Sequence, residues 1–348
     1  MSRGSRGEHH LLPLNTLTAQ YFQQLDPAHL SLPNASTIIH PDVQTVIYDH
    51  MFNEATVWPL PPVSYRARVL KTIISRIEEA ITDPEEDELN SDLIETWTDL
   101  ISRPKPSQIQ QVQQLTYIKY TAPAATTTTS PVPHTVITNE SRGLIYSSGT
   151  TGFRTWEASL HLGTYLSTPT GAAHLAGKRV IELGAGTGFV SMYAAKYLQP
   201  QFVLATDREG PLIGNMKRCK ERNGLGAEFG VGAWEWGTPL VYPTKDDTEG
   251  AQEDLAFDVA LGADLTYDTD LLPLLFATLH DLFDNYHVKE FILSATLRNQ
   301  KTFQAFLDAC ENNLFKAECL PFESSQPEDQ TGFFHETGIP IRTYRVTR

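Results

Sequence analysis

The stretch Val180-Ile-Glu-Leu-Gly-Ala-Gly-Thr-Gly-Phe189 decides the fold of this chain. It begins as an apolar strand, passes through glycines at alternate positions and continues as a helical pattern. Glycine allows a sharp backbone turn and a close approach of a ligand to the peptide groups beside a helix N-terminus. The stretch therefore predicts a ligand-binding loop that joins a strand to a helix in an α/β protein.

The spacing of these glycines differs from that of a dinucleotide-binding loop. That fingerprint reads G-x-G-x-x-G, whereas Gly184, Gly186 and Gly188 form G-x-G-x-G. Glu182 precedes the first glycine, and a carboxylate there would repel a pyrophosphate. About twenty residues later a second strand ends at Asp207, which can accept hydrogen bonds from both ribose hydroxyls. Adenosine without phosphates points to S-adenosylmethionine, and the alternative is a glycine turn that only packs tightly.

Length and composition indicate a globular protein. The 348 residues allow one large domain or two smaller ones, and 41% apolar residues are enough for a core. No apolar run approaches the roughly 18 residues of a membrane span, and the first residues lack the apolar centre of a signal peptide. Cys219, Cys310 and Cys319 have the spacing of neither a disulfide framework nor a metal site. The cytosol or the nucleus is the default location, and we expect a cytoplasmic protein with reduced, packed cysteines, no metal and no membrane partner.

The chain is acidic, with 42 Asp and Glu residues against 27 Lys and Arg and a formal net charge of −15. Such a charge disfavours nonspecific binding to a phosphate backbone, so no direct nucleic-acid partner is expected. It favours a partner with a basic surface, but acidity also serves solubility alone. Charge does not decide between these two explanations.

Two apolar stripes at helical spacing lie within a predicted N-terminal helical module, residues 1–115. The first stripe is Tyr65, Val69, Ile73, Ile77 and Ile81, and the second is Leu89, Leu93, Trp97, Leu100 and Ile101. The acidic run Asp83–Glu88 separates them and predicts a solvated turn, although its proline and acids also suit a helix start.

Residues 116–148 are predicted to form a β-hairpin and a low-complexity linker. Strand patterns at 115–120 and 134–138 flank a threonine- and proline-rich segment, 122–133, that we expect to be disordered. The domain that begins at residue 149 alternates strands with helices, which predicts a doubly wound, mainly parallel sheet. Final antiparallel strands are expected at 316–320 and 341–346.

Several blocks together resemble the seven-β-strand, Rossmann-like methyltransferases that use S-adenosylmethionine, and among them the eukaryotic protein lysine methyltransferases. Asp264-Leu-Thr-Tyr267 supplies the Asp-x-x-Tyr motif that follows the fourth strand of that branch. Three further blocks resemble the elongation factor 2 lysine methyltransferases: Tyr146–Ala158, Trp234-Glu-Trp236 and Ala295–Asn299. The resemblance implies a methyltransferase domain at 149–348 that acts as a monomer on a lysine of elongation factor 2, with another translation protein as the alternative acceptor.

The resemblance also implies which residues contact the cofactor. The cofactor is lined by Gly184, Ala185 and Gly186, together with Glu182 and Gly188. Asp207 holds the ribose and Trp236 flanks the adenine. Ala263 touches the base or the methionine moiety, and Trp156 closes the methionine end. By pattern alone Trp156 is equally a core aromatic residue. If Trp234 and Trp236 alternate on a strand they share one face, and we interpret Trp234, where the family usually has an aliphatic residue, as structural.

Asp264 and Tyr267 are the predicted catalytic residues. The motif implies that Asp264 hydrogen-bonds the incoming amine and that Tyr267 forms an aromatic wall for the lysine stem. A lysine with a pKa of about 10.4 is protonated near neutral pH, so the site must favour the neutral amine by desolvation and by the nearby sulfonium charge. Without the motif, Asp264 is equally a helix N-cap and Tyr267 a packed aromatic residue.

Two other classes of function stay open on the sequence. A nucleic-acid amino-methyltransferase would carry Asn/Asp-Pro-Pro-aromatic after the fourth strand, and Asp264–Tyr267 lacks those prolines. A small-molecule acceptor gives no reason for the helical module. A noncatalytic binding protein on a methyltransferase fold is disfavoured by the retained Glu182, Asp207 and Asp264, and cofactor titration would identify it.

Overall fold

The computed structural model describes residues 8–83, 85–104, 107, 114–124, 132–141, 150–241 and 255–348. The chain divides into two compact units, Met1–Thr121 and Ala122–Arg348. Each unit has its own apolar core.

The first unit is helical. Its elements are α1 (Glu8–Phe22), η1 (Pro27–His29), α2 (Ala35–Ile38), α3 (Pro41–Ile47), η2 (Tyr48–Phe52), α4 (Val63–Ala80), α5 (Ser91–Ser102) and the strand β1 (Thr116–Thr121). Four of the five residues of the first predicted stripe, Tyr65, Val69, Ile73 and Ile77, form the buried face of α4, whereas Ile81 follows the last residue of the helix. Spacing of three to four residues places these side chains on one face of the helix.

The second stripe is only partly correct. Leu93 and Leu100 of α5 are buried, but Ile101 is 47% exposed. The helix begins after Asn90, whose side chain accepts hydrogen bonds from the first turn, so the acidic run does not start it. The described part of that run is a turn, as predicted, in which the Asp87 carboxylate accepts from the N–H groups of Thr82 and Asp83.

The second unit contains a seven-stranded sheet in the order β5-β4-β3-β6-β7-β9-β8. Its strands are β3 (Arg179–Leu183), β4 (Phe202–Asp207), β5 (Phe229–Ala233), β6 (Val259–Ala263), β7 (Glu290–Thr296), β8 (Lys316–Cys319) and β9 (Ile341–Thr347). The first five are parallel, and β9 pairs antiparallel with both β7 and β8. The prediction of a doubly wound sheet with two final antiparallel strands is confirmed.

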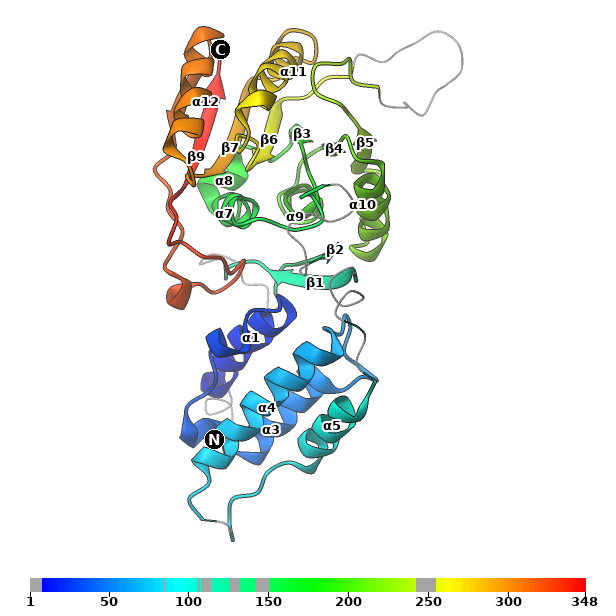
Figure 1. Cartoon of the computed structure of the whole chain (residues 1–348), viewed down its shortest axis with the longest axis vertical. Coiled ribbons are helices and arrows are strands. Elements are labelled where there is room, and N and C mark those ends of the chain that lie inside the picture. The colour runs from blue at the N-terminus through cyan, green and yellow to red at the C-terminus, as the bar shows by residue number, and fades with distance from the viewer. Residues whose placement is uncertain are drawn as a thin grey trace, which may run out of the picture. The chain divides into compact units, whose positions relative to one another are not determined.

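Helices cover both faces of this sheet (Figure 1). One face carries α7 (Glu157–Leu166), α9 (Phe189–Tyr197) and α10 (Gly210–Arg222), with α8 (Pro169–Ala173) after α7; the other carries α11 (Leu272–Asp284) and α12 (Gln300–Asn312). The short elements η3 (Thr269–Leu271) and η4 (Pro327–Asp329) lie in connections. The strand β2 (Thr135–Glu140) packs against α9 and α10.

Strand β3 pairs with β4 on one side and with β6 on the other, so the chain changes direction across the sheet at this strand. Ligands of open α/β sheets bind outside the carboxyl ends of the strands at such a switch point. The glycine loop begins at the carboxyl end of β3 and Asp264 follows the end of β6. The topology therefore brings the predicted cofactor and acceptor residues to one edge.

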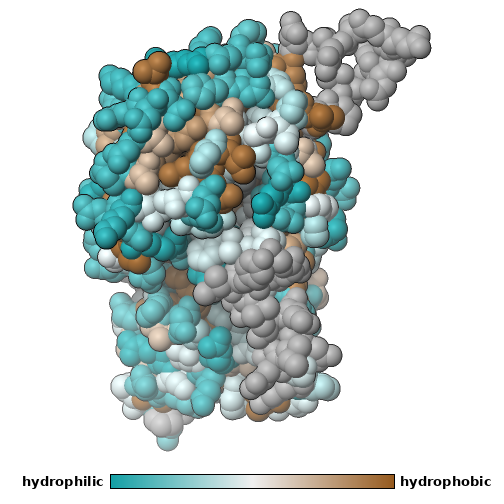
Figure 2. All heavy atoms as spheres, turned by 45° about the horizontal axis from the view of Figure 1, so that its top comes forward, coloured by the Kyte–Doolittle hydropathy of each residue, from teal (hydrophilic) through white to brown (hydrophobic). Residues whose placement is uncertain are grey.

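Hydrophilic residues cover most of the surface shown in Figure 2, and apolar side chains form smaller groups between them. Cys219 and Cys310 are buried free thiols, as expected, whereas Cys319 is exposed and the prediction that it is a packing residue is wrong. In the part of the chain that the structure describes, no helix has the length and apolar character needed to cross a membrane. Residues 125–131 of the expected disordered segment lie outside the described residues.

Candidate active site

The loop after β3 has a backbone that only glycine adopts without strain. The φ angles of Gly184, Gly186 and Gly188 are +58°, +54° and +77°. A Cβ atom on Gly184 would lie 2.8 Å from Cδ2 of Leu265, and one on Gly186 would lie 3.0 Å from the carbonyl oxygen of Gly152. Side chains at Gly184 and Gly186 would therefore be crowded by neighbouring residues of the protein itself.

Asp207 lies at the carboxyl end of β4 beside this loop. Its Oδ2 accepts the N–H of Gly186 at 3.0 Å, and its Oδ1 accepts the N–H of Glu209 at 3.2 Å. Burial raises the pKa of Asp207, and these backbone donors oppose the rise. Each oxygen keeps a further lone pair, which suits a carboxylate that receives a ribose diol.

Glu182 does not present its carboxylate to the loop. The side chain is buried, and Oε2 accepts the N–H of Ser191 at 2.9 Å and also its hydroxyl hydrogen. Burial raises the pKa of Glu182 to about 7. The argument that this carboxylate repels a pyrophosphate is therefore not supported, because the group is inside the domain and ties the end of β3 to the first turn of α9.

Trp234 and Trp236 follow the end of β5, so strand alternation does not place them on one face. Trp234 is 3% exposed, and its indole N–H donates to the carbonyl oxygen of Thr238 at 2.8 Å. Its structural interpretation is confirmed. Trp236 is half-buried, and its Cζ2 would lie 3.5 Å from a Cβ on Gly184, so it borders the glycine loop.

Ala185 and Ala263 supply small side chains at this edge. Ala185 is buried and its N–H donates to the carbonyl oxygen of Thr206 at 2.8 Å. Ala263, half-buried, is the last residue of β6 and pairs with Ser294. Both are small side chains at the carboxyl ends of neighbouring strands, the position at which ligands of open α/β sheets bind.

A hydrogen-bond chain that sequence reasoning missed supports the loop from the side of α7. The Glu140 carboxylate accepts the N–H and the hydroxyl of Thr155, at 3.1 Å and 2.7 Å, and that hydroxyl lies 2.7 Å from the hydroxyl of Thr187. Thr187 belongs to the glycine loop. The available signal was the block Tyr146–Ala158, which contains Thr155.

Asp264 follows β6 in a left-handed conformation, with φ of +57°. Its Oδ1 accepts the N–H of Thr296 at 3.1 Å, and its Oδ2 lies 2.6 Å from Nη1 of Arg298. It is not a helix N-cap, because Asp268 caps η3. A positive φ in a residue other than glycine costs about 1–3 kcal/mol and is concentrated at functional sites.

Tyr267 is 61% exposed and is not a packed aromatic residue. The pKa of its phenol is raised mainly by partial burial and, to a smaller extent, by the negative charges of Asp268, Asp207 and Asp264. The structure thus brings Tyr267 near the carboxyl ends of both β4 and β6. Its ring is available to a large incoming side chain.

Trp156 precedes α7 and is half-buried. Its indole N–H donates to the carbonyl oxygen of Thr151 at 3.2 Å, and the guanidinium groups of Arg154 and Arg298 lie 4.9 Å and 5.4 Å from its ring centre. Arg298 also reaches Glu157. Trp156 is therefore joined to the acceptor end of the site by cation–π contacts, and it is not a core residue.

Arg298 and Glu157 are site residues that sequence reasoning did not single out. Both lie within blocks that carried the resemblance, Ala295–Asn299 and Tyr146–Ala158. The two residues are 141 positions apart, and a single amino-acid sequence contains no pattern that predicts a contact over that separation.

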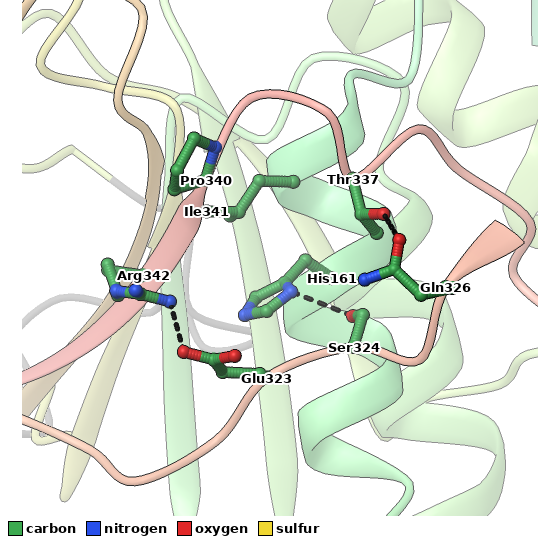
Figure 3. Close-up of a pocket in the computed structure, with 8 residues that line it drawn as sticks. All are labelled: His161, Glu323, Ser324, Gln326, Thr337, Pro340, Ile341 and Arg342. Atoms are coloured by element: carbon green, nitrogen blue, oxygen red, sulfur yellow. Dashed lines mark hydrogen bonds and ion pairs between the residues drawn. The ribbon is translucent and has the colours of Figure 1, made fainter.

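A pocket of about 140 Å³ is lined by His161 of α7 and by residues on either side of the connection that leads into β9, among them Ser324 and Thr337 (Figure 3). One turn along α7 from Glu157, His161 contacts the Ser324 hydroxyl through Nδ1 at 2.8 Å, and that hydroxyl lies 3.0 Å from Nε2 of His335. Burial lowers the pKa of both imidazoles, that of His161 to about 3. This neutral chain ties the segment before β9 to the helix that carries Glu157.

Comparison with known proteins decides the family. Residues 145–313 match the lysine methyltransferase family. Over 339 residues, 96% of this chain and 98% of the other, the chain is 36% identical to protein-lysine N-methyltransferase EFM3 of Chaetomium thermophilum. This chain belongs to the lysine methyltransferase family. The lysine methyltransferase is also 30% identical to EFM3 of Saccharomyces cerevisiae, over 60% of its own length and 64% of that protein. It is 28% identical to human EEF2KMT, over 51% and 54% respectively.

This lysine methyltransferase is an S-adenosylmethionine-dependent enzyme that acts on protein. Its residues fit that cofactor: the glycine loop carries no side chains at Gly184 and Gly186, Asp207 offers acceptors at the end of β4, and Trp236 offers a flat ring beside Gly184. The ring of Trp156 and the carboxylate of Asp264 lie near one another because both contact Arg298.

Proposed function

We propose that this enzyme methylates a lysine of elongation factor 2, that it does so in the cytoplasm, and that it acts as a monomer. One observation carries the site assignment: Leu265 packs against Gly184, so the neighbouring Asp264 lies beside the loop that would hold the methyl donor. The substrate assignment is supported by the quoted sequence blocks and by the likeness to EEF2KMT, whose name refers to elongation factor 2.

Bound S-adenosylmethionine supplies a methyl group on a positively charged sulfur. Asp207 would accept hydrogen bonds from the ribose hydroxyls, Trp236 would flank the adenine, and Trp156 would close the methionine end. The peptide groups of Gly184, Ala185 and Gly186 would line the cofactor, with Ala263 at the end of the neighbouring strand β6 and Gly188 at the start of α9. Glu182 acts indirectly, because its contact with Ser191 holds the loop.

Asp264 accepts a hydrogen bond from the acceptor lysine and thereby orients the lone pair of its neutral amine. The exposed ring of Tyr267 packs along the lysine stem. The lysine would first lose a proton to water, and its lone pair would then accept the methyl group that the cofactor supplies, with the electrons of the broken C–S bond left on the sulfur. No strong general base is needed, since desolvation and nearby positive charge favour the neutral amine.

The first experiment incubates the purified enzyme with labelled S-adenosylmethionine and a cytosolic extract that lacks the endogenous enzyme. We expect a labelled band that mass spectrometry identifies as elongation factor 2 methylated on lysine. Asp264→Ala should abolish the label while cofactor binding stays measurable. Asp268→Ala is a matched control, because Asp268 is exposed and caps only η3.

Each other outcome points to a different function. Label on another protein changes the substrate assignment and keeps the enzyme class. Cofactor binding without label on any protein supports a noncatalytic binding role. Full activity of Asp264→Ala removes Asp264 from the mechanism.

The helical unit Met1–Thr121 is proposed to recognise the folded substrate, because selection of one lysine needs contacts beyond the acceptor channel. Its helix α5 exposes Ile94 and Ile101, which are 41% and 47% accessible. Two full helical turns separate these residues, so they share one face. That face is available for an apolar contact.

A further inference from the structure

Arg298 and Asp264 form an ion pair in a partly enclosed position. Nη1 of Arg298 lies 2.6 Å from Oδ2 of Asp264, while the N–H of Thr296 donates to Oδ1 at 3.1 Å. The Asp264 side chain is only 11% exposed, so water and salt screen this pair less than a surface pair. The last residue of β7 and the segment that follows it therefore hold both oxygens of the carboxylate.

A carboxylate beside the acceptor creates an electrostatic problem for methyl transfer to lysine. A negative charge within about 4 to 6 Å stabilises a protonated amine and raises its pKa by about 1 to 3. The protonated amine has no lone pair with which to attack a methyl group. If Asp264 orients the acceptor, its charge has to be offset.

The charges nearest to Asp264 are balanced. Nη2 of Arg298 lies 3.1 Å from Oε2 of Glu157, and Nη2 of Arg154 lies 3.4 Å from Oε1 of the same residue. Two carboxylates and two guanidinium groups thus form one connected cluster, and Arg298 is the member that contacts both acids. Removal of Arg298 would leave Asp264 without a cationic contact in the described part of the chain.

Charged groups also face this cluster from other elements. Asp207 at the end of β4 and Asp268 raise the pKa of Tyr267, as Asp264 does, whereas Arg208, which follows β4, lowers it. From the segment before β9, His335 interacts with Glu157, and burial lowers the pKa of His335 so that it is neutral near pH 7. These groups are unchanged in the variants below.

We propose that Arg298 is a positioning residue that offsets the charge of Asp264, so that this carboxylate orients the acceptor lysine as a neutral amine instead of stabilising its protonated form. The inference rests on the proposed function, in which Asp264 accepts a hydrogen bond from the acceptor. The ion pair leaves lone pairs of the carboxylate available while cancelling most of its field. The acceptor amine then loses its proton to water more easily.

The test is the pH profile of kcat for Arg298→Met and Arg298→Lys, with saturating cofactor and the protein acceptor isolated in the labelling experiment. The profile of kcat reports groups of the enzyme–substrate complex. For Arg298→Met we expect kcat near pH 7 to fall about tenfold to a hundredfold, because the acid limb of the profile moves up by about 1 to 2 pH units. At high pH, where the acceptor amine is neutral in both proteins, kcat should recover. Arg298→Lys keeps the positive charge, so the acid limb of its kcat profile should lie at the same pH as that of the wild type.

Glu157→Gln supplies a test in the opposite direction. It removes a negative charge from the same cluster, so the acid limb should move to lower pH. If Arg298→Met fails to fold or to bind cofactor, this variant decides alone: a downward movement supports the inference and an unchanged limb overturns it.

A loss by the same factor at every pH in Arg298→Met would show that Arg298 acts only by holding structure, and would overturn the inference. Activity equal to wild type would also overturn it. Asp264→Ala distinguishes a failure of the role proposed for Arg298 from a failure of the role proposed for Asp264. If that variant is inactive while the limb of Arg298→Met is unchanged, only the inference fails; if it keeps full activity, the proposed role of Asp264 fails as well.

Discussion

The backbone N–H of Gly186 donates a hydrogen bond to Oδ2 of Asp207 over 3.0 Å. The bond joins the glycine loop after β3 to the carboxyl end of the neighbouring strand β4. The carboxylate proposed to hold the ribose therefore also fixes the loop proposed to hold the rest of the cofactor. A change in either residue is expected to disturb both parts of the cofactor site.

Gly186→Ala should weaken cofactor binding by about tenfold or more, because its Cβ would lie 3.0 Å from the carbonyl oxygen of Gly152. Gly177→Ala is the matched control: its φ is also positive, at +70°, but nothing lies within 4 Å of the added Cβ. Each variant should lose about 1–2 kcal/mol of stability from its backbone conformation. Calorimetric titration and thermal unfolding measure the two effects. Equal cofactor affinity in both variants would contradict a close-packed loop.

Trp234→Ala and Trp236→Ala should have different consequences. Trp234 is a buried core residue, so its truncation is expected to lower the free energy of unfolding by about 3–5 kcal/mol. Trp236 is half-buried beside Gly184, so its truncation should mainly weaken cofactor affinity. Denaturant unfolding without cofactor, followed by cofactor titration, separates them. The assignment of Trp236 would not survive an unchanged cofactor affinity.

Glu182→Gln should change the pH dependence of stability. Burial raises the pKa of Glu182 to about 7, so the folded state holds a proton that the unfolded chain has released. The stabilisation linked to that proton is complete below the ordinary carboxyl pKa and is lost as pH rises through about 7. Glutamine keeps an acceptor for Ser191 without a charge.

The free energy of unfolding of Glu182→Gln, relative to wild type, is therefore expected to rise from about pH 5 to about pH 8. The buried imidazoles of His161 and His335 have lowered pKa values and favour the folded state as pH rises. That trend is common to both proteins and cancels in the difference. A difference that does not vary with pH would show that Glu182 is ionised in the folded state.

The double substitution Ile94→Ser and Ile101→Ser tests substrate recognition by the helical unit. We expect a rise of about tenfold in KM for the protein acceptor with unchanged cofactor affinity, because these side chains are already exposed and the fold loses little. Leu314→Ser, at a residue that is 84% exposed in the other unit, is the control. Steady-state kinetics give the result. Equal KM values for all three proteins would remove this face from substrate recognition.

The sequence predicted the sheet and its edge well because the signals are local. The glycine stretch, the apolar strands of four to seven residues and the alternation with helices each depend on neighbours along the chain. The helical stripe of α4 was equally readable. Less local statements failed: Ile101 is exposed, Cys319 is exposed, and the two tryptophans after β5 do not alternate on a strand.

The sequence by itself determined the parallel sheet, the position of the glycine loop and the presence of carboxylates at two strand ends, because backbone conformation and side-chain periodicity are properties of short segments. Only the tertiary structure decided where those carboxylates point. It turned Glu182 inward to Ser191, joined Asp207 to Gly186 and paired Asp264 with Arg298, residues that lie 34 positions apart. Charge partners are chosen by distance in space, and distance in space is set by how the strands and helices pack.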